Sequence, residues 1–192
     1  MLGLGHLLHN RVRDQQLAPA RPGDDARGQV DLTAEVVAIA FADLAGYTRL
    51  TEEEGEELAL DAVERFVESV EHTLPDDARV IKTIGDEVMV VGSDPAALTD
   101  WAVGFQSLHR TRPRPRIGVH WGETLYRDGD YYGREVNLAA RVAARAAGGE
   151  VLVTRPVVEQ AGEHLEFEAI GEVRLKGFQE VTEIFLARGG EV

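Results

Sequence analysis

Any fold for this chain must bury a short apolar run near residue 40. Residues 36–41 are Val-Val-Ala-Ile-Ala-Phe, without a polar side chain. A run this short and rich in β-branched residues predicts a buried strand. The turn expected at residues 42–47 contains Asp43 and Gly46. We therefore expect an acidic side chain where a buried strand ends.

A helix and a hairpin are predicted next. Residues 51–54, Thr-Glu-Glu-Glu, form a capping box that predicts a helix start. Strands are predicted at 79–84 and 87–91, because the Gly85-Asp86 pair between them is typical of a tight hairpin. The apolar positions of the helix recur every four residues and predict one buried face, at Leu58, Ala62, Phe66 and Val70.

The rest of the chain adds two long helices and several strands. Asp94-Pro95 predicts the cap of a second helix, and the alanine-rich residues 136–147 predict a third that ends at Gly148-Gly149. The second helix is expected to bury Leu98, Trp101, Phe105 and Leu108. A strand is predicted at 116–120, and residues 123–126 either continue it or pair with it. Further strands are expected at 150–154, 167–175 and 181–187, with a short helix at 156–161.

The order strand, helix, two strands, helix, strand defines the fold class. It is the βαββαβ order of a ferredoxin-like core, so we predict an α+β fold with this core and extra C-terminal strands. In such a sheet the first strand and the hairpin are central neighbours. Asp43 and Asp86 are therefore expected to converge at one end of the sheet. The fold alone does not give a function.

Composition divides the chain into an arm and one domain. The 192 residues are 44% hydrophobic, which suits one compact domain. Residues 16–29 carry Pro, Gly, Arg and Asp, but no large apolar residue after Leu17. We predict a flexible N-terminal arm or linker at 1–34 and a single domain at 35–190. A connection to a regulatory element and a disordered terminus both fit the arm.

Charge and residue usage exclude several classes of function. The net charge of −14 disfavours general binding of nucleic acid or anionic membrane, because both need a basic surface. The absence of cysteine excludes disulfides, zinc–thiolate sites and thiol nucleophiles. No apolar run approaches the roughly 20 residues that span a bilayer, and residues 1–10 lack the features of a signal peptide. We expect a cytoplasmic protein without membrane insertion in this chain.

The two aspartates suggest metal chemistry. Carboxylates that converge at one end of a sheet can hold two divalent ions, which clamp the attacking and leaving oxygens of a phosphoryl displacement. Mg²⁺ favours such a site, with phosphate oxygens and water completing the shell. The alternative is that Asp43 and Asp86 are ordinary turn formers, since Asp suits both positions.

Four motifs favour the metal interpretation. Residues 41–48, Phe-Ala-Asp-Leu-Ala-Gly-Tyr-Thr, and 82–89, Lys-Thr-Ile-Gly-Asp-Glu-Val-Met, resemble the two metal-binding signatures of class III adenylyl and guanylyl cyclases. Residues 117–122, Ile-Gly-Val-His-Trp-Gly, resemble the strand motif that follows, and residues 130–141 resemble the segment leading into the catalytic helix. The likeness covers about residues 36–188, and the fold of that family also has a ferredoxin-like core.

The resemblance implies a reaction and its metal ligands. Asp43 and Asp86 would bind two Mg²⁺ or Mn²⁺ ions. One ion would activate the ribose 3′ hydroxyl of ATP for attack on the α-phosphate, and the other would hold the triphosphate and the departing pyrophosphate. The product would be 3′,5′-cyclic AMP.

The resemblance also assigns residues that contact the ribose and the phosphates. Asn137 and Arg141 are four apart in a helix and so share one face. The matching Asn orients the ribose, and the matching Arg stabilises charge on the phosphate in the transition state. Lys176 matches a lysine that contacts the β- and γ-phosphates. The alternative is that these are solvated surface residues, as we interpret Arg145, and that Lys176 is a hairpin lysine.

Base choice is assigned to Lys82 and Asp130. In the class III cyclases that this chain resembles, a Lys and an Asp at these positions recognise adenine. The Lys donates to a ring nitrogen, and the Asp accepts from the exocyclic amine. Guanylyl cyclases usually carry Glu and Cys there, and this chain has no cysteine. Lys82 could instead be an edge-strand charge. Asp130 also suits the turn that contains it, and the two roles are compatible.

The resemblance implies a shared site. In the family, one subunit supplies the aspartates that bind the metal ions. The other supplies the Lys and Asp that recognise the base, the Asn and Arg, and the lysine that contacts the phosphates. This chain has both sets, which implies a head-to-tail homodimer. Three alternatives stay open: a guanylyl or relaxed-specificity cyclase, a catalytically silent cyclase-like regulator, and an unrelated acidic ferredoxin-like binding module. His120 lies among apolar strand residues, so we expect it to be packed rather than catalytic.

Overall fold

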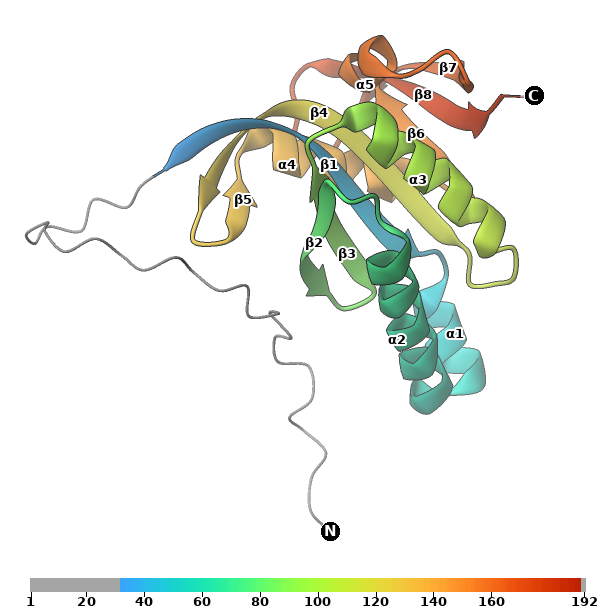
Figure 1. Ribbon diagram of the computed structural model, residues 1–192. Coiled ribbons are helices and arrows are strands. Elements are labelled where there is room, and N and C mark those ends of the chain that lie inside the picture. Colours follow the sequence, from blue (N-terminus) through green and yellow to red (C-terminus); the bar gives the residue numbers. More distant parts are fainter. Residues whose placement is uncertain (1–31, 191–192) are drawn as a thin grey trace, which may run out of the picture. The chain divides into compact units, whose positions relative to one another are not determined.

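A computed structural model describes residues 32–190 (Figure 1). They form one mixed sheet in which seven strands follow the order β2-β3-β1-β4-β6-β8-β7, and β5 pairs with β4. The strands are β1 Thr33–Leu44, β2 Ala78–Ile84, β3 Glu87–Gly92, β4 Pro115–Arg127, β5 Asp130–Tyr132, β6 Val151–Thr154, β7 Leu165–Arg174 and β8 Val181–Gly189. The helices are α1 Tyr47–Glu54, α2 Glu56–Thr73, α3 Pro95–Leu108, α4 Arg134–Arg145 and α5 Arg155–Gln160.

The predicted ferredoxin-like core is confirmed. Strand β1 lies between β3 and β4 and is antiparallel to both, so the apolar run does form a central strand. The hairpin β2–β3 lies on one side of it. Strand β6 pairs in parallel with β4, and β8 and β7 extend the sheet beyond it, as the extra C-terminal strands. The fold class is α+β.

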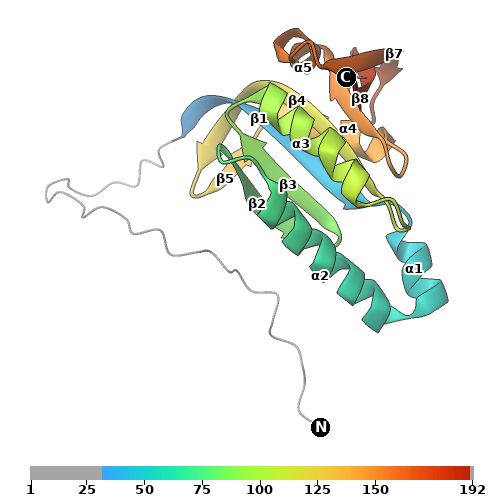
Figure 2. The ribbon, with the colours of Figure 1, turned by 45° about the vertical axis from the view of Figure 1, so that its right-hand side comes forward.

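Helices cover both faces of the sheet (Figure 2). Alternate residues of a strand point to opposite faces. On one face, Ala38 and Ala40 pack in a cluster with Phe66 of α2 and Phe105 of α3. On the other face, the neighbouring β1 residues pack against α4, in a cluster that includes Ile39, Phe41, Met89, Val136, Ala139 and Ala143. Helix α4 is therefore separated from α2 and α3 by the sheet.

Gly118 allows α4 to lie directly on β4. A Cβ atom at this position would lie 2.2 Å from the backbone nitrogen of Ala143 and 2.6 Å from its Cα. Only glycine tolerates so close an approach of helix backbone to strand backbone. The glycine of the motif at residues 117–122 thus fixes the position of the helix that carries Asn137 and Arg141.

The predicted start of the first helix is wrong. The chain forms two helices, α1 and α2, which are separated at Gly55 with φ +93°. Thr51 lies inside α1, where its hydroxyl donates to the carbonyl of Tyr47 at 3.0 Å. Because the break resets the helix, the buried positions of α2 are Ala59, Phe66 and Val70, and Leu58 is 51% exposed.

Other boundaries differ by a few residues. Strand β4 is continuous from Pro115 to Arg127, so residues 123–126 continue the strand. Strand β1 extends to Leu44, so Asp43 is the second-last residue of the strand and does not lie in a loop. Asp94 caps α3 as predicted, accepting from Ala96 N at 2.8 Å. Leu108 ends α3 beyond the core and is 66% exposed.

The predicted arm falls mainly outside the described residues, which begin at Leu32. Thr33 and Ala34 are the first residues of β1. Among residues 32–190, no helix has the length and apolar character needed to cross a bilayer.

Candidate active site

The sheet brings Asp43 and Asp86 together. Asp43 lies near the end of β1 and is 8% exposed. In the β1–β3 register it faces Glu87, and Asp86 precedes Glu87 in the β2–β3 turn. The two carboxyl groups that the motifs assign to metal binding therefore converge at one end of the sheet.

Burial and crowding perturb this acidic cluster. Desolvation by burial, and then the adjacent Asp43 carboxyl and its charge, raise the pKa of Asp86 to about 7. Burial, and then the Asp43 charge, also raise the pKa of Glu87 above its ordinary value. The positive charge of Arg116 opposes both shifts. Burial and the charge of Asp43 therefore make Asp86 and Glu87 easier to protonate than exposed carboxylates, despite Arg116.

Arg116 is a site residue that sequence reasoning missed. It faces Asp43 across the β1–β4 pair, and its Nε donates to Asp43 Oδ2 at 2.8 Å, with Nη2 of the same guanidinium also in contact. In the sequence it is only the first residue of a predicted strand. The signal available was the alternation of side chains along β4, which puts Arg116 on the same face as Gly118 and hence facing α4.

The acidic cluster suits a hard divalent cation. Asp43 Oδ1 is buried and has no hydrogen-bond partner among the described residues. Carboxylate oxygens are the ligands that Mg²⁺ and Mn²⁺ prefer. Within residues 32–190, no group of three or more His, Cys, Asp or Glu side chains is placed to hold a metal. Two carboxylates leave most coordination positions to other oxygen donors, such as phosphate and water.

Lys82 and Asp130 form an ion pair. Lys82 Nζ of β2 lies 2.6 Å from Asp130 Oδ2 of β5, although 48 residues separate them in sequence. Both side chains are partly exposed, at 35% and 24%. Asp130 is held further by its Oδ1, which accepts from the backbone N–H of Tyr131 at 2.8 Å. The structure therefore brings together the two residues that the motifs assign to base recognition.

A second network fixes the β5 hairpin behind this pair. The buried hydroxyl of Tyr131 donates to Glu35 of β1 at 3.0 Å and accepts from Arg79 of β2 at 3.0 Å. Burial and the bond to Glu35 raise the pKa of Tyr131. Sequence analysis did not identify these residues, because their partners lie on three separate strands.

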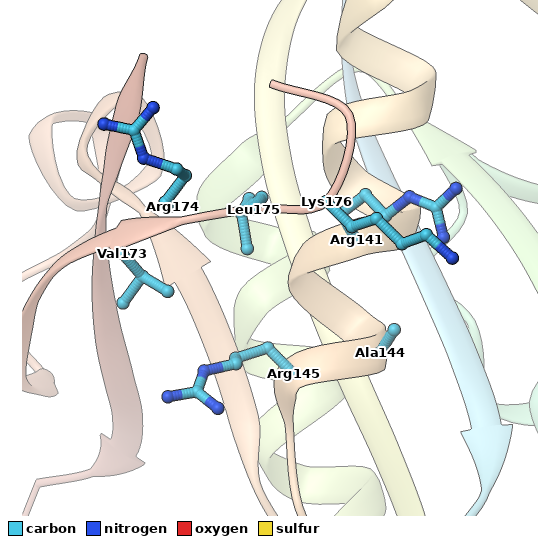
Figure 3. A pocket seen from close by; sticks show the side chains of 7 residues that line it. All are labelled: Arg141, Ala144, Arg145, Val173, Arg174, Leu175 and Lys176. Carbon is cyan, nitrogen blue, oxygen red and sulfur yellow. The ribbon is translucent and has the colours of Figure 1, made fainter. Parts of the chain in front are cut away.

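Asn137 and Arg141 lie on the outer side of α4. Both are exposed, whereas Val136, Ala139 and Ala143 of the same helix are buried against the sheet. Arg141 borders a surface hollow of about 440 Å³ between α4 and the loop after β7 (Figure 3). Its lining also includes Ala144, Arg145, Val173, Arg174, Leu175 and Lys176.

The hollow concentrates positive charge on an acidic chain. Arg141 and Lys176 extend in the same direction at one side of the hollow, whereas Arg174 points away from it (Figure 3). Arg174 donates instead to the carbonyl of Gln179 at 2.8 Å. The lining has no acidic residue and four cationic ones, of which only Arg174 turns its guanidinium away, in a chain of net charge −14. Such a surface favours a polyanion.

The predicted residues thus form separate groups within one chain. Across residues 32–190, no hydrogen bond or ion pair joins Asp43 or Asp86 to Asn137, Arg141 or Lys176. Arg141 is nevertheless close enough for its charge to lower the pKa of Glu87. The two aspartates and the Asn137, Arg141 and Lys176 group lie on the face of the sheet that carries α4, and α2 and α3 lie on the other face.

Comparison with known proteins identifies the family. Residues 31–188 match the family model described as Adenylate and Guanylate cyclase catalytic domain. A pH-sensitive adenylate cyclase of Mycobacterium tuberculosis is 35% identical over 176 residues, which cover 88% of this chain and 44% of that protein. An adenylate cyclase of Streptomyces coelicolor is 34% identical over 142 residues, which cover 72% of this chain and 36% of that protein.

A solved structure agrees with the fold. The adenylyl cyclase CyaB from P. aeruginosa superposes with a TM-score of 0.72 at 23% identity, over 84% of this chain and 98% of that one. The chain therefore belongs to the adenylate and guanylate cyclase catalytic domain family, and the resemblance carried by the four motifs is confirmed. It spans less than half the length of the two bacterial relatives.

Proposed function

We propose that residues 35–190 form a catalytic domain that converts ATP to 3′,5′-cyclic AMP and pyrophosphate. The observation that carries this proposal is the Lys82–Asp130 pair at 2.6 Å on the same sheet as the converging Asp43 and Asp86. Family membership supplies the reaction class. The two relatives described above are named adenylate cyclases, which supports ATP as the substrate.

The ion pair supplies the features that adenine recognition needs. The ammonium of Lys82 donates to a ring nitrogen, and the carboxylate of Asp130 accepts from the exocyclic amine. Guanine presents a carbonyl acceptor at that edge, which would face the Asp130 carboxylate without a proton between them. The bond from the Tyr131 N–H holds Asp130 in place, so the acceptor is oriented before the base arrives.

Asp43 and Asp86 would hold the divalent ions, Mg²⁺ or Mn²⁺. When bound, such ions lower the pKa of the ribose 3′ hydroxyl and neutralise the triphosphate. Asp43 Oδ1 is buried and accepts no hydrogen bond from the described residues, so this oxygen is available to a bound ion. Arg116 holds the other oxygen, and its guanidinium lies close enough to this end to attract the phosphates.

Asn137, Arg141 and Lys176 would act on the ribose and the phosphates. The amide of Asn137 would orient the ribose. The guanidinium of Arg141 would stabilise the charge that spreads over the phosphate oxygens in the transition state. Lys176, which shares the cationic hollow with Arg141, would contact the β- and γ-phosphates as a point charge.

A head-to-tail homodimer would complete two equivalent sites. In one chain the acidic cluster and the Asn137–Arg141 surface make no direct contact, although each is half of what the reaction needs. We call Asp43 and Asp86 the acidic half-set, and Lys82, Asp130, Asn137, Arg141 and Lys176 the α4 half-set. A second copy related by a two-fold axis would place the acidic half-set of each chain opposite the α4 half-set of its partner. The open α4 face carries both half-sets.

Product analysis tests the proposed function. The purified chain is incubated with ATP and Mn²⁺, in parallel with GTP and Mn²⁺, and the products are separated by chromatography. We expect cyclic AMP and pyrophosphate from ATP, much less product from GTP, and none from an Asp86→Ala control. Equal turnover of GTP would support relaxed base choice. Nucleotide binding without any cyclic product would support a silent regulatory domain and reject the proposal.

A further inference from the structure

His120 is a buried histidine that the proposed mechanism does not use. It is 3% exposed on β4, and both of its ring nitrogens have partners. Nε2 lies 2.5 Å from Glu135 Oε2 in the first turn of α4, and Nδ1 lies 2.7 Å from Thr154 Oγ1 at the end of β6. The sequence interpretation of His120 as a packed residue is correct, but its hydrogen bonds connect three elements.

The partners determine the tautomer of the ring. An ionised carboxylate only accepts, so Nε2 carries the proton and donates to Glu135. In the neutral ring Nδ1 then accepts from the hydroxyl of Thr154, which can donate. Burial lowers the pKa of His120, whereas Glu135 raises it. Arg134 is the other charge that acts on the ring, and it also lowers the pKa.

Neighbouring residues are adapted to this arrangement. A Cβ atom on Gly122 would lie 2.9 Å from His120 Nε2 and 3.1 Å from Glu135 Oε2, so glycine leaves room for the pair. Thr154 occupies the position before α5 but makes no side-chain cap, because its hydroxyl is bound to His120. The network therefore occupies the Thr154 hydroxyl and needs the space that Gly122 leaves.

Helix α4 begins without a side-chain cap, and Glu135 anchors its first turn to β4 instead. The residue before the helix is Gly133, which provides no side-chain hydrogen bond to the first turn. Glu135 Oε1 contacts Arg134 at 3.2 Å, and Oε2 contacts His120. Among the described residues, the Glu135–His120 bond is thus the only contact by which a charged side chain anchors this turn to the interior. Asn137 follows two residues later, and Arg141 one turn beyond.

We propose that His120 is a positioning residue: through Glu135 it sets the orientation of the first turn of α4, and thereby the reach of Asn137 and Arg141. This inference rests on the proposed function, because it assigns those two side chains to the reaction. His120 itself does not contact the substrate. Its bond to Thr154 relates α4 to the β4–β6 part of the sheet.

Kinetics of Glu135→Ala test the positioning role. We expect kcat to fall about 10- to 100-fold, because a misplaced catalytic group loses rate even when its chemistry is intact. The KM for ATP should change by less than about threefold, since the base and phosphate contacts remain. Glu135→Gln should recover most of the rate, because its amide oxygen still accepts from Nε2–H. Glu64→Ala, which removes an exposed glutamate from α2 on the opposite face, is the matched control.

A second background separates positioning from general stability. In an Asn137→Ala chain, adding Glu135→Ala should cause less further loss of kcat than it does in the parent chain, because one of the two groups to be positioned is already gone. An equal loss in both backgrounds would overturn the proposal. So would a kcat within twofold of the Glu64→Ala control, or a rise in KM alone.

Nitrogen-15 NMR of the histidine rings gives a readout that does not depend on turnover. We expect His120 as the neutral Nε2–H tautomer, with a slowly exchanging ring proton that is lost in Glu135→Ala. An Nδ1–H tautomer would overturn the proposal whatever the activity. The two failures are distinguishable: an inactive parent chain rejects the proposed function, whereas an active parent with an equally active Glu135→Ala variant rejects positioning alone.

Discussion

The acidic end of the sheet and the cationic surface of α4 differ in how their charges are compensated. At the acidic end, Asp43 is buried and paired with Arg116, and burial and the neighbouring Asp43 raise the pKa of Asp86 to about 7. On α4, Arg141 and Asn137 are exposed, and within residues 32–190 neither they nor Lys176 make a side-chain hydrogen bond or ion pair. The strands preorganise the first group, whereas no partner among the described residues orders the second.

This difference has a physical origin. Strand register fixes Asp43 opposite Glu87 and Arg116, so the acidic cluster forms wherever the sheet forms. Long cationic side chains on a helix surface keep their rotamer freedom until a partner arrives, and lose it on binding. We therefore expect changes at the acidic end to affect metal affinity and stability. Changes on α4 should affect turnover alone.

The largest effect is expected from Arg141→Ala. If Arg141 stabilises transition-state charge, kcat should fall about 10²- to 10³-fold, as for loss of one preorganised donor. Arg145→Ala is the matched control, because it removes an arginine of the same helix and the same hollow. Steady-state kinetics with ATP and Mn²⁺ compare the two. Equal losses would show that the hollow acts by total charge and not through one placed guanidinium.

Base discrimination should change next. Lys82→Ala breaks the pair with Asp130 and removes the donor to the adenine ring. We expect the ratio of kcat/KM for ATP to kcat/KM for GTP to fall about 10- to 100-fold. This fold-change corresponds to the free energy of one charge-assisted hydrogen bond. Arg79→Ala, which frees the Tyr131 hydroxyl instead, should change the ratio less. An unchanged ratio for Lys82→Ala would remove the pair from base recognition.

Metal affinity should depend on pH through Asp86. Because its pKa is raised to about 7, a proton competes with the cation below that pH. The Kd for Mn²⁺, measured by calorimetry, should rise by up to about tenfold for each unit that the pH falls below 7, and should level off above it. Asp86→Asn has no titrating group there and should bind weakly with a flatter profile. A parent profile that is flat between pH 5.5 and 8 would contradict the account.

A smaller effect is expected on stability. Arg116→Ala leaves the Asp43 carboxylate buried without its partner, at a cost of about 1–3 kcal/mol. Mn²⁺ should recover part of this loss, because the cation binds the folded state. Thermal unfolding in EDTA measures the loss of stability, and thermal unfolding in Mn²⁺ measures how much of it the cation recovers. If the variant is as stable as the parent in EDTA, Arg116 does not compensate the acidic cluster.

The same contrast explains how much the sequence could predict. The strand at residues 36–41 and the hairpin at Gly85-Asp86 have short-range signals, so the sheet core and the meeting of Asp43 with Asp86 were predictable. The break at Gly55 was not, because the capping box at 51–54 satisfies the same local rule inside a helix that begins at Tyr47. Local propensity does not show which of two overlapping helix starts the packing selects.

Site residues divide in the same way. The motifs identify residues whose type is diagnostic, such as Asp130 and Asn137. Arg116 and Glu135 are common residue types, and their roles arise from the partners that β4 and α4 bring to them. Contacts between elements far apart in sequence leave no local pattern. His120 was placed correctly in the core, yet its two bonds required the positions of α4 and β6.

Complementation between two inactive chains tests the central claim most directly. An Asp43→Ala chain lacks the acidic half-set, and an Asn137→Ala chain lacks the α4 half-set, so each alone should keep at most about 1% of the parent rate. Mixed together, they should form heterodimers in which one site is intact, and cyclic AMP formation should return to at most about half of the parent rate per dimer. If the mixture stays inactive while the chains exchange subunits, each domain must complete its site alone, and the shared-site account is wrong.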